Sequence, residues 1–290
     1  MKKIFILIIL IILIIAIGVF NRYKITNIEN FKGISEKVTI LKTKNKNNFL
    51  NIFKSNTKYL NTNDLIVYKN PLIFDDNFSK KENILGRVIG LPGDNIKIKN
   101  SQVYINDEIL NPDYELYFLY RITMSDTTNF NILLQSFDLQ INNIINSFAC
   151  NFIATQNVAD NVAKINNVVN IRKIIKNESK CNYDIFPFEP RIFWDADNFG
   201  PFIIPKNGTT IKLTPEIYYI YKIALNVYED NIVVFDNAQF EINGVKVEKY
   251  TFKHNYFFVL NDNRYFTKDS RSFGLIPEDQ ILGKVINSKI

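Results

Sequence analysis

A long apolar segment at the start of the chain stands apart from the mixed pattern that follows it. Lys2 and Lys3 precede 17 apolar residues, Ile4 to Phe20. As a helix this segment rises about 25 Å, near the lower limit for crossing a hydrocarbon core of about 30 Å. A cleaved signal peptide has a similar basic start, but this segment is longer than most signal-peptide apolar regions, and no small-x-small cleavage site follows it. We therefore predict an uncleaved membrane anchor over residues 1–24.

Beyond residue 64 the apolar residues form short runs that end at turn residues, which is the pattern of a mainly β protein. The runs 96–99 and 103–105 flank Asn100-Ser101 and predict a hairpin, and Asn243-Gly244 predicts a turn after the run 239–242. Further strands are predicted at 38–41, 65–68, 86–91, 202–204, 210–213, 232–235 and 256–260.

Two stretches carry apolar residues at helical spacing. Between residues 113 and 182 the spacing is roughly helical, which predicts an α-containing insertion in the β protein. Thr214 and Pro215 suit the N-cap and the first position of a helix, and the pattern extends this helix to about Tyr228. Gly and Pro are too scarce for a flexible linker, and no internal repeat is visible.

Composition excludes several classes of protein. The 24 Phe and 15 Tyr among 290 residues exclude disorder over most of the chain. Two Cys exclude a disulfide-rich scaffold and a four-Cys zinc site, and a single His excludes His-based metal clusters and argues against a Ser-His-Asp triad. The net charge of +6 suits a body beside anionic lipid. We expect no cofactor, no metal and no nucleic-acid partner.

Three segments carry more motif information than the rest. They are Gly86 to Asp94 (GRVIGLPGD), Asn261 to Arg271 (NDNRYFTKDSR) and Asn63 to Tyr68 (NDLIVY). Behind an N-terminal anchor, they resemble the bacterial signal peptidase I (leader peptidase) family, whose members carry a Gly-Asp-x-Val-Val-Val strand at the third segment. Smaller matches resemble the large-insert branch of that family found in Bacteroidetes, at 194–201, 204–208 and 250–253.

The resemblance implies a single-pass protein of the bacterial inner membrane with its C-terminal body on the periplasmic face. It also implies a serine endopeptidase that removes signal peptides from exported preproteins after Ala-x-Ala sites, with the bilayer and the translocon as further partners. The implied domains are the anchor at 1–24, the first part of a β catalytic core at 25–112, an inserted cap at 113–195, and the second part of the core at 196–290.

The chain departs from the family at the catalytic positions. Family members use a Ser nucleophile and a neutral Lys as general base, and burial must lower the ordinary Lys pKa of about 10.4 for this role. The Lys position is Gly86 here, which cannot accept a proton. Counting back from Asp64 aligns Ser55 with the family's nucleophile, although the residues next to Ser55 do not match the nucleophile motif. The alternative interpretation is that Ser55 is an ordinary loop serine. The nearest lysines that could replace the base are Lys80 and Lys81. The alternative interpretation is that these two lysines are simply a solvated pair of charges.

Five charged residues carry over onto the family's framework beside the site: Arg87, Asp262, Arg264, Asp269 and Arg271. We expect hydrogen-bonded ion pairs among them, although fold maintenance alone also explains such charges. Thr267 keeps the hydroxyl of a family Ser that hydrogen-bonds the Lys. Asn261 replaces a turn Gly, and Asn is among the least costly residues at positive φ.

Two functions remain open from the sequence. One is an active endopeptidase in which an unusual base serves Ser55. The other is a catalytically inactive homologue that binds signal peptides or other partners at the membrane, or a decaying gene product. About one residue in seven is Asn, and Asn, Ile and Lys have AT-rich codons, so drift in composition explains eroded motifs. Cys150 and Cys181 either pair in an oxidising periplasm or are free buried thiols.

Overall fold

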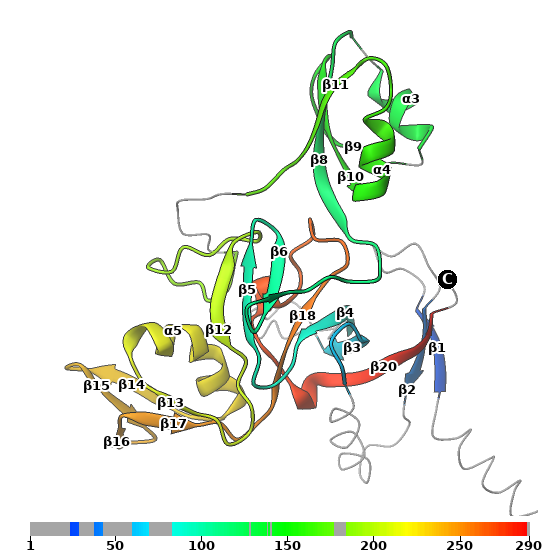
Figure 1. The fold of residues 1–290 in the computed structure, drawn as a ribbon. Coiled ribbons are helices and arrows are strands. Elements are labelled where there is room, and N and C mark those ends of the chain that lie inside the picture. Colours follow the sequence, from blue (N-terminus) through cyan, green and yellow to red (C-terminus); the bar gives the residue numbers. More distant parts are fainter. Residues whose placement is uncertain are drawn as a thin grey trace, which may run out of the picture. The chain divides into compact units, whose positions relative to one another are not determined.

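The computed structural model describes residues 24–28, 38–42, 60–69, 83–127, 129–137, 139, 141–176 and 184–288. The predicted anchor segment Ile4 to Phe20 lies outside these ranges. Within them, no helix has the length and apolar character needed to cross a membrane. The chain is mainly β with a few short helices, as the sequence predicts (Figure 1). It divides into two compact units, one formed by Met1–Val88 with Pro277–Ile290 and the other by Ile89–Ile276.

The first unit is built from antiparallel strands: β1 Lys24–Ile28, β2 Val38–Lys42, β3 Leu65–Lys69, β4 Asn83–Gly90 and β20 Ile281–Ser288. They follow the order β1-β2-β20-β3-β4, and the 3-10 turn Glu278–Gln280 precedes β20. Ile66, Val67 and Tyr68 are all buried, so β3 is covered on both faces. A continuous apolar run without alternation is what such a strand requires.

The second unit contains several further antiparallel strands: β5 Asn95–Lys99, β6 Gln102–Ile105, β7 Glu108–Ile109, β12 Phe199–Ile203, β13 Thr210–Lys212, β14 Val233–Asp236, β15 Gln239–Ile242, β16 Val245–Val247, β17 Lys249–Thr251 and β18 Tyr256–Leu260. They form sheets of the order β12-β5-β6-β7, β14-β15-β16 and β13-β17. The two-residue strand β19, Ile276–Pro277, lies at the boundary between the units.

Four two-residue hairpin loops in this unit share one geometry. Both central residues have positive φ at Asn100-Ser101, Asn106-Asp107, Asn237-Ala238 and Asn243-Gly244, as a type I′ turn requires. Asn stands first in every loop, because its short side chain tolerates the left-handed region better than most residues. The hairpin predicted at 96–105 and the turn predicted at Asn243-Gly244 are confirmed.

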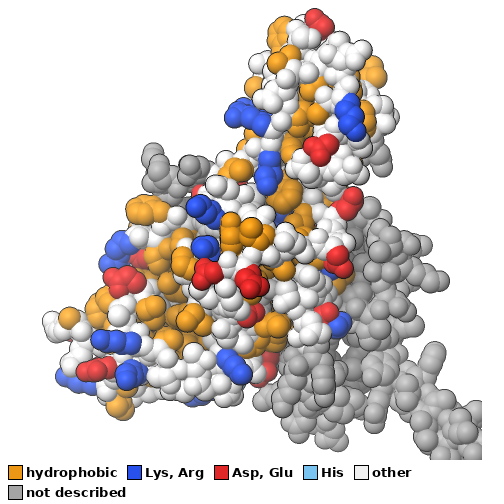
Figure 2. Space-filling view, viewed as in Figure 1, with side chains coloured by type: hydrophobic (Ala, Val, Ile, Leu, Met, Phe, Trp, Pro, Cys, Tyr) orange, Lys and Arg blue, Asp and Glu red, His pale blue; other side chains and the backbone are white. Residues whose placement is uncertain are grey.

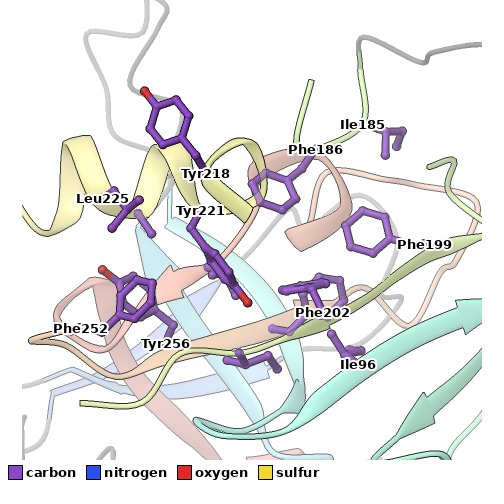
Figure 3. Close-up of a cluster of buried hydrophobic side chains, with 14 of the residues drawn as sticks. Ile96, Ile185, Phe186, Phe199, Phe202, Tyr218, Tyr221, Leu225, Phe252 and Tyr256 are labelled. Atoms are coloured by element: carbon purple, nitrogen blue, oxygen red, sulfur yellow. The ribbon is translucent and has the colours of Figure 1, made fainter. Parts of the chain in front are cut away.

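The helix predicted after Thr214 is confirmed and covers the main core. Helix α5, Pro215–Ile223, has the Thr214 hydroxyl as its N-cap acceptor and Pro215 in its first turn, and it continues as the π-helix Ala224–Tyr228. Figure 3 shows Tyr218 and Tyr221 on this helix above a group of buried rings that includes Phe202, Phe252 and Tyr256. The ring centroids of Tyr221 and Phe252 lie 5.5 Å apart. Aromatic packing therefore dominates this core, consistent with the Phe and Tyr content.

A second core belongs to a smaller substructure that we call the four-stranded lobe. It consists of strands β8 Tyr117–Met124, β9 Ile141–Asn146, β10 Ala149–Thr155 and β11 Val168–Lys173, with helices α3 Phe130–Gln135 and α4 Gln156–Val162. The strand order is β11-β8-β10-β9, and both helices lie on one side of the sheet (Figure 1). Its buried side chains form a cluster separate from the main core.

The helical spacing predicted between residues 113 and 182 is wrong for part of that range. Ile132 and Val158 lie in helices, but Ile144 and Ile145 lie in β9, and Val168 lies in β11. These residues are β-branched and occur as adjacent pairs, Ile144-Ile145 and Val168-Val169. Adjacent β-branched residues favour a strand, because their side chains fit a pleated surface and lose rotamer freedom in a helix.

A buried carboxylate ties the end of the π-helix to the segment before β18. Glu229 is 2% exposed and accepts hydrogen bonds from the hydroxyls of Tyr250 (2.8 Å) and Tyr256 (3.0 Å). It also accepts from the backbone N–H groups of Lys253 (2.9 Å) and His254 (3.2 Å). Four donors on two oxygens satisfy a charge that burial alone would make costly.

Glu229→Gln tests this arrangement, because the amide keeps the shape but has one acceptor oxygen instead of two. At least one buried N–H then loses its acceptor, so we expect the free energy of unfolding to fall by about 2 kcal/mol. Urea unfolding of the full chain in detergent, followed by circular dichroism, measures the loss. Glu248→Gln, at an exposed position, is the matched control and should change stability by less than about 0.5 kcal/mol. Equal losses in the two variants would contradict the role assigned to Glu229.

Cys150 is a free, fully buried thiol in the four-stranded lobe, and Cys181 lies outside the described residues. Burial raises the pKa of Cys150 to about 11, so about one thiol in a thousand is the reactive thiolate at pH 8. We expect iodoacetamide to modify Cys150 only slowly in the native chain and rapidly after denaturation without a reductant. Mass spectrometry of tryptic peptides reads both outcomes. A disulfide-linked peptide containing Cys150 and Cys181 would contradict the free thiol.

Candidate functional site

An ion pair between Asp269 and Arg271 lies at the centre of the predicted framework. Asp269 is the N-cap of the short helix α6, Ser270–Phe273, and its carboxylate accepts from the backbone N–H of Arg271 at 3.0 Å. The Arg271 guanidinium forms a fork to the same carboxylate, with Nη2 2.7 Å from Oδ2 and Nε 3.0 Å from Oδ1. The two side chains are 0% and 2% exposed. This pair confirms one of the ion pairs expected from the sequence.

The remaining donors of Arg271 hold three backbone carbonyls. Nη1 donates to the carbonyl oxygens of Arg264 (2.9 Å) and Ala196 (3.3 Å), and Nη2 donates to that of Phe266 (2.9 Å). All five N–H groups of the guanidinium are therefore used within the protein. A Lys at this position has three donors and no planar fork, so it cannot reproduce these bonds.

Two further polar residues, Asn261 and Ser270, complete the hydrogen bonding between the end of β18 and α6. Asn261 donates its backbone N–H to Asp269 Oδ2 at 3.0 Å and its side-chain amide to the carbonyl of Lys268 at 3.2 Å. Its φ is not positive, so the expectation that Asn261 occupies a left-handed turn position is wrong. The fully buried Ser270 hydroxyl accepts from the N–H of Val259 at 2.9 Å. Asn261 thus acts through its amide, and the sequence did not point to Ser270.

Arg264 departs from the expectation of an ion pair. Its side chain is 7% exposed, and Nε has no hydrogen-bond partner and no carboxylate salt bridge among the described residues. Burial, and after it the positive charge of Arg271, lower the pKa of Arg264 to about 10, while Tyr114, Asp269 and Asp262 act in the opposite direction. Asp262 raises the pKa of Arg264, but no salt bridge joins these two described side chains. Arg264 lines a cavity of about 40 Å³ with Lys176, Asp197 and Tyr265, which provides room for water to solvate the guanidinium.

Thr267 is half-buried in the same loop, and its carbonyl oxygen accepts from the N–H of Asp269 at 2.7 Å. No lysine among the described residues donates a hydrogen bond to its hydroxyl, or to the hydroxyl of any other described Ser or Thr. The family role proposed for Thr267 needs a lysine beside it. That partner therefore has to come from outside the described ranges, and the role of Thr267 stays a prediction.

The first unit contains Gly86, the residue that the sequence resemblance aligns with the family's lysine. Gly86 is buried in β4 and pairs with Ile66 of β3. Next to it, Nη1 of Arg87 donates to the carbonyl of Asn63 at 2.9 Å. Asn63 has φ +76°, so the Asn at this family Gly position does occupy the left-handed region. Arg87 thus fixes the turn that leads into β3.

Asp64 completes this turn in two ways. It accepts from the backbone N–H of Asn61 at 2.8 Å, and its other oxygen lies 2.6 Å from Nζ of Lys284 in β20. The backbone of Val88 exchanges bonds with the same turn, donating to Asp64 at 2.8 Å and accepting from Asn63 at 2.7 Å. The segment just after the position expected for the nucleophile is therefore firmly held.

The two candidate groups for chemistry, Ser55 and the lysine pair Lys80-Lys81, lie outside the described residues. Within the described ranges, Lys173 has a lowered pKa: burial lowers it, and the carboxylate of Asp197 acts in the opposite direction. Its Nζ lies 4.3 Å from the centre of the Phe118 ring, at the end of β11. Lys173 belongs to the four-stranded lobe and has no serine or threonine partner among the described residues, so the geometry does not make it a general base.

Substitution of Arg271 and of Arg264 by Met compares a paired buried arginine with one that has no described salt bridge. Arg271→Met leaves the buried Asp269 carboxylate unpaired, and we expect it to cost about 3–5 kcal/mol of unfolding free energy. Arg264→Met removes a buried cation that has no described side-chain hydrogen bond, so we expect a cost below about 1 kcal/mol. The lowered folded-state pKa of Arg264 means that its destabilising contribution is fully present below about pH 10. Urea unfolding at pH 7 therefore tests both variants, and equal losses would contradict the assignment.

Much of the chain, including both framework motifs, is similar to known proteins. The family model described as "Signal peptidase, peptidase S26" matches residues 1–144 and 225–288. Signal peptidase I of Buchnera aphidicola subsp. Baizongia pistaciae is 25% identical over 223 residues, which cover 77% of this chain and 53% of that protein. Signal peptidase IB of Staphylococcus aureus is 69% identical over 29 residues, 10% of this chain and 15% of that protein.

The chain therefore spans about half the length of the Buchnera relative and a smaller share of the staphylococcal one. The family match is much broader than either framework motif, since its two parts include both the Gly86–Asp94 segment and the Asn261–Arg271 segment. Because the family model matches more than half of the residues, the chain belongs to the signal peptidase family S26.

Proposed function

We propose that this protein is a signal peptidase I–type serine endopeptidase that removes signal peptides from exported preproteins after Ala-x-Ala sites. The observation that carries the proposal is family membership over more than half of the chain, including the loop shaped by Asp269 and Arg271. We further propose a single-pass anchor at 1–24 in the bacterial inner membrane, with the body on the periplasmic face. Signal peptides, the lipid bilayer and the translocon are the partners that this placement implies.

The proposed chemistry begins at the hydroxyl of Ser55. A base takes the hydroxyl proton while the oxygen attacks the scissile carbonyl carbon, and the amine of the mature protein leaves with a proton. Water then hydrolyses the acyl-enzyme and releases the signal peptide. Thr267 is proposed as a hydroxyl partner of the base, and the framework residues Arg87, Asp262, Arg264, Asp269 and Arg271 hold the surrounding backbone.

An active enzyme requires a general base, and the residue that would supply it is not identified. Gly86 has no side chain to accept a proton. It is also buried opposite Ile66, so a water molecule does not readily take the place of a lysine amine as proton acceptor there. The nearest lysines along the chain are Lys80 and Lys81. This observation favours a second candidate function, a catalytically inactive homologue that binds signal peptides at the membrane without cleaving them.

The domain assignment remains part of the proposal: the anchor at 1–24, core segments at 25–112 and 196–290, and an inserted cap at 113–195. Residues 145–224 separate the two parts matched by the family model, and they overlap the proposed cap from 145 to 195. The helices α3 and α4 lie within the proposed cap and support its α-containing character.

Processing of a preprotein with an Ala-x-Ala site in signal-peptidase-depleted cells tests the active function. We expect the full chain to release the mature protein and Ser55→Ala to abolish release, because the nucleophile is lost. Ser136→Ala is the matched control, since the Ser136 hydroxyl is exposed and bonds only to the backbone at the end of α3. If the wild-type chain is well expressed and yields no mature product, the active function is overturned.

A signal peptide with a photo-crosslinking residue distinguishes the second candidate. Crosslinking to a wild-type chain that does not process the substrate supports the inactive binding homologue, and absence of crosslinking rejects it. Gly86→Lys adds a further arm. It supplies an amine at the family's base position, so a gain of processing in this variant alone shows that the base is the missing part.

A further inference from the structure

Strand register places two arginines directly opposite each other on the four-stranded lobe. Arg172 of β11 pairs with Arg121 of β8. Directly opposed residues of an antiparallel pair point to the same face, with Cβ atoms about 5 Å apart. The neighbours Ile122 and Ile171 pack in the core beneath α3 and α4, so the two arginines lie on the face that these helices leave open.

Two asparagines extend this pair into a row across all four strands. Asn151 of β10 is opposite Arg121, and Asn143 of β9 is opposite Asn151. Nε of Arg121 donates to Oδ1 of Asn151 at 3.0 Å, and Nδ2 of Asn151 donates to Oδ1 of Asn143 at 2.8 Å. Asn151 is 7% exposed, so a buried amide fixes the direction of the Arg121 side chain. We call these four residues the arginine row.

The positive charge of the row has no partner among the described residues. No described carboxylate forms an ion pair with Arg121 or Arg172, and the terminal nitrogens of both have no described hydrogen bond. On the face drawn in Figure 2, basic, acidic and apolar side chains are interspersed, and no broad basic region is seen on that face. Like charges placed directly opposite each other destabilise a strand pair, and a bound anion would reverse that effect.

We propose that the arginine row binds the carboxylates of an acidic polypeptide segment. A guanidinium presents parallel N–H groups that match a carboxylate, and Nε of Arg121 is already used, which leaves its outer edge for a ligand. The row spans about 14 Å across four strands, the length of roughly four extended residues. Leu119 and Ile153 pair beside it on the same face and are half-buried, so an apolar border flanks the charges. A peptide uses both features, whereas a free inorganic anion uses only the charges.

The row lies one strand segment away from the framework loop. Tyr117, at the start of β8, donates its N–H to the carbonyl of Asp262 at 3.0 Å, and its own carbonyl accepts from the N–H of Arg264 at 2.8 Å. Arg121 follows four residues later, about 14 Å along the same strand. The acidic segment would therefore be held near the loop that carries Thr267. Binding at the row does not require catalysis at Ser55.

Fluorescence anisotropy with the full chain in detergent tests the proposal. The probes are a rhodamine-labelled hexaglutamate peptide, the same peptide with Gln in place of Glu, and inorganic phosphate as competitor. We expect the Glu peptide to bind at least tenfold more tightly than the Gln peptide. Arg172→Gln should weaken binding of the Glu peptide at least fivefold, because an exposed guanidinium with no described structural bond is lost.

Two further variants distinguish binding at the arginine row from attraction by net charge. Lys164→Gln removes the same charge from an exposed lysine of the lobe that bonds to Asn161, and it should leave binding unchanged. Arg172→Glu should abolish binding and raise the temperature at which the four-stranded lobe unfolds, because it replaces a repulsive cross-strand pair by an attractive one. Equal weakening by Lys164→Gln would overturn the proposal, since it would show attraction by net charge alone. Phosphate binding without peptide binding would also overturn it, as would preference for anionic lipid vesicles over the peptide.

Discussion

The fork between Arg271 and Asp269 determines the shape of the loop that carries the family's second motif. Each of the five guanidinium N–H groups has an acceptor inside the protein, and three of those acceptors are backbone carbonyls. A charge buried this deeply is tolerated only when it is fully paired and hydrogen-bonded. The ion pair thus does more than neutralise two charges, because it specifies where residues 264 and 266 must lie relative to α6.

This dependence also explains why framework residues are poor evidence for catalysis. Asp269 and Arg271 make their described bonds with the chain itself, so an active enzyme and an inactive homologue need them equally. Arg87 likewise holds the turn at Asn63. The proposed chemistry therefore depends on Ser55 and on the source of a base, because Gly86, the predicted position of the family's lysine, has no side chain that accepts a proton. The strands around Gly86 are nevertheless paired.

Local rules made part of this fold predictable from the sequence. Asn in the left-handed region marks the hairpin loops, and a Thr-Pro pair marks the start of α5, because both signals depend only on adjacent residues. The loop Asn237-Ala238 was missed, since Ala rarely occupies positive φ. The failure at β9 has a different cause: its isoleucines fit two periodicities, and pairing with β10 decides between them.

The candidate site was predictable only where a motif carried the information. The motif located Asp269, Arg271 and Arg264, yet it did not show that Arg264 lacks an ion-pair partner among the described residues. Glu229 gave no signal, because its four donors come from residues 21 to 27 positions away that meet it only in the folded chain. Long-range satisfaction of a buried charge is a property of the tertiary structure, and adjacent residues do not encode it.

The separate core of the four-stranded lobe has a consequence for how the protein unfolds. Its buried side chains pack among themselves, and the main core packs around the rings beneath α5. Cooperativity requires shared packing, so two cores of this kind open with different free energies. Amide hydrogen exchange in β8 and β10 should then follow one opening reaction while exchange in β18 follows another. For such a chain a single melting temperature describes neither part. Heat or a protease can unfold the four-stranded lobe or the main core while the other remains folded.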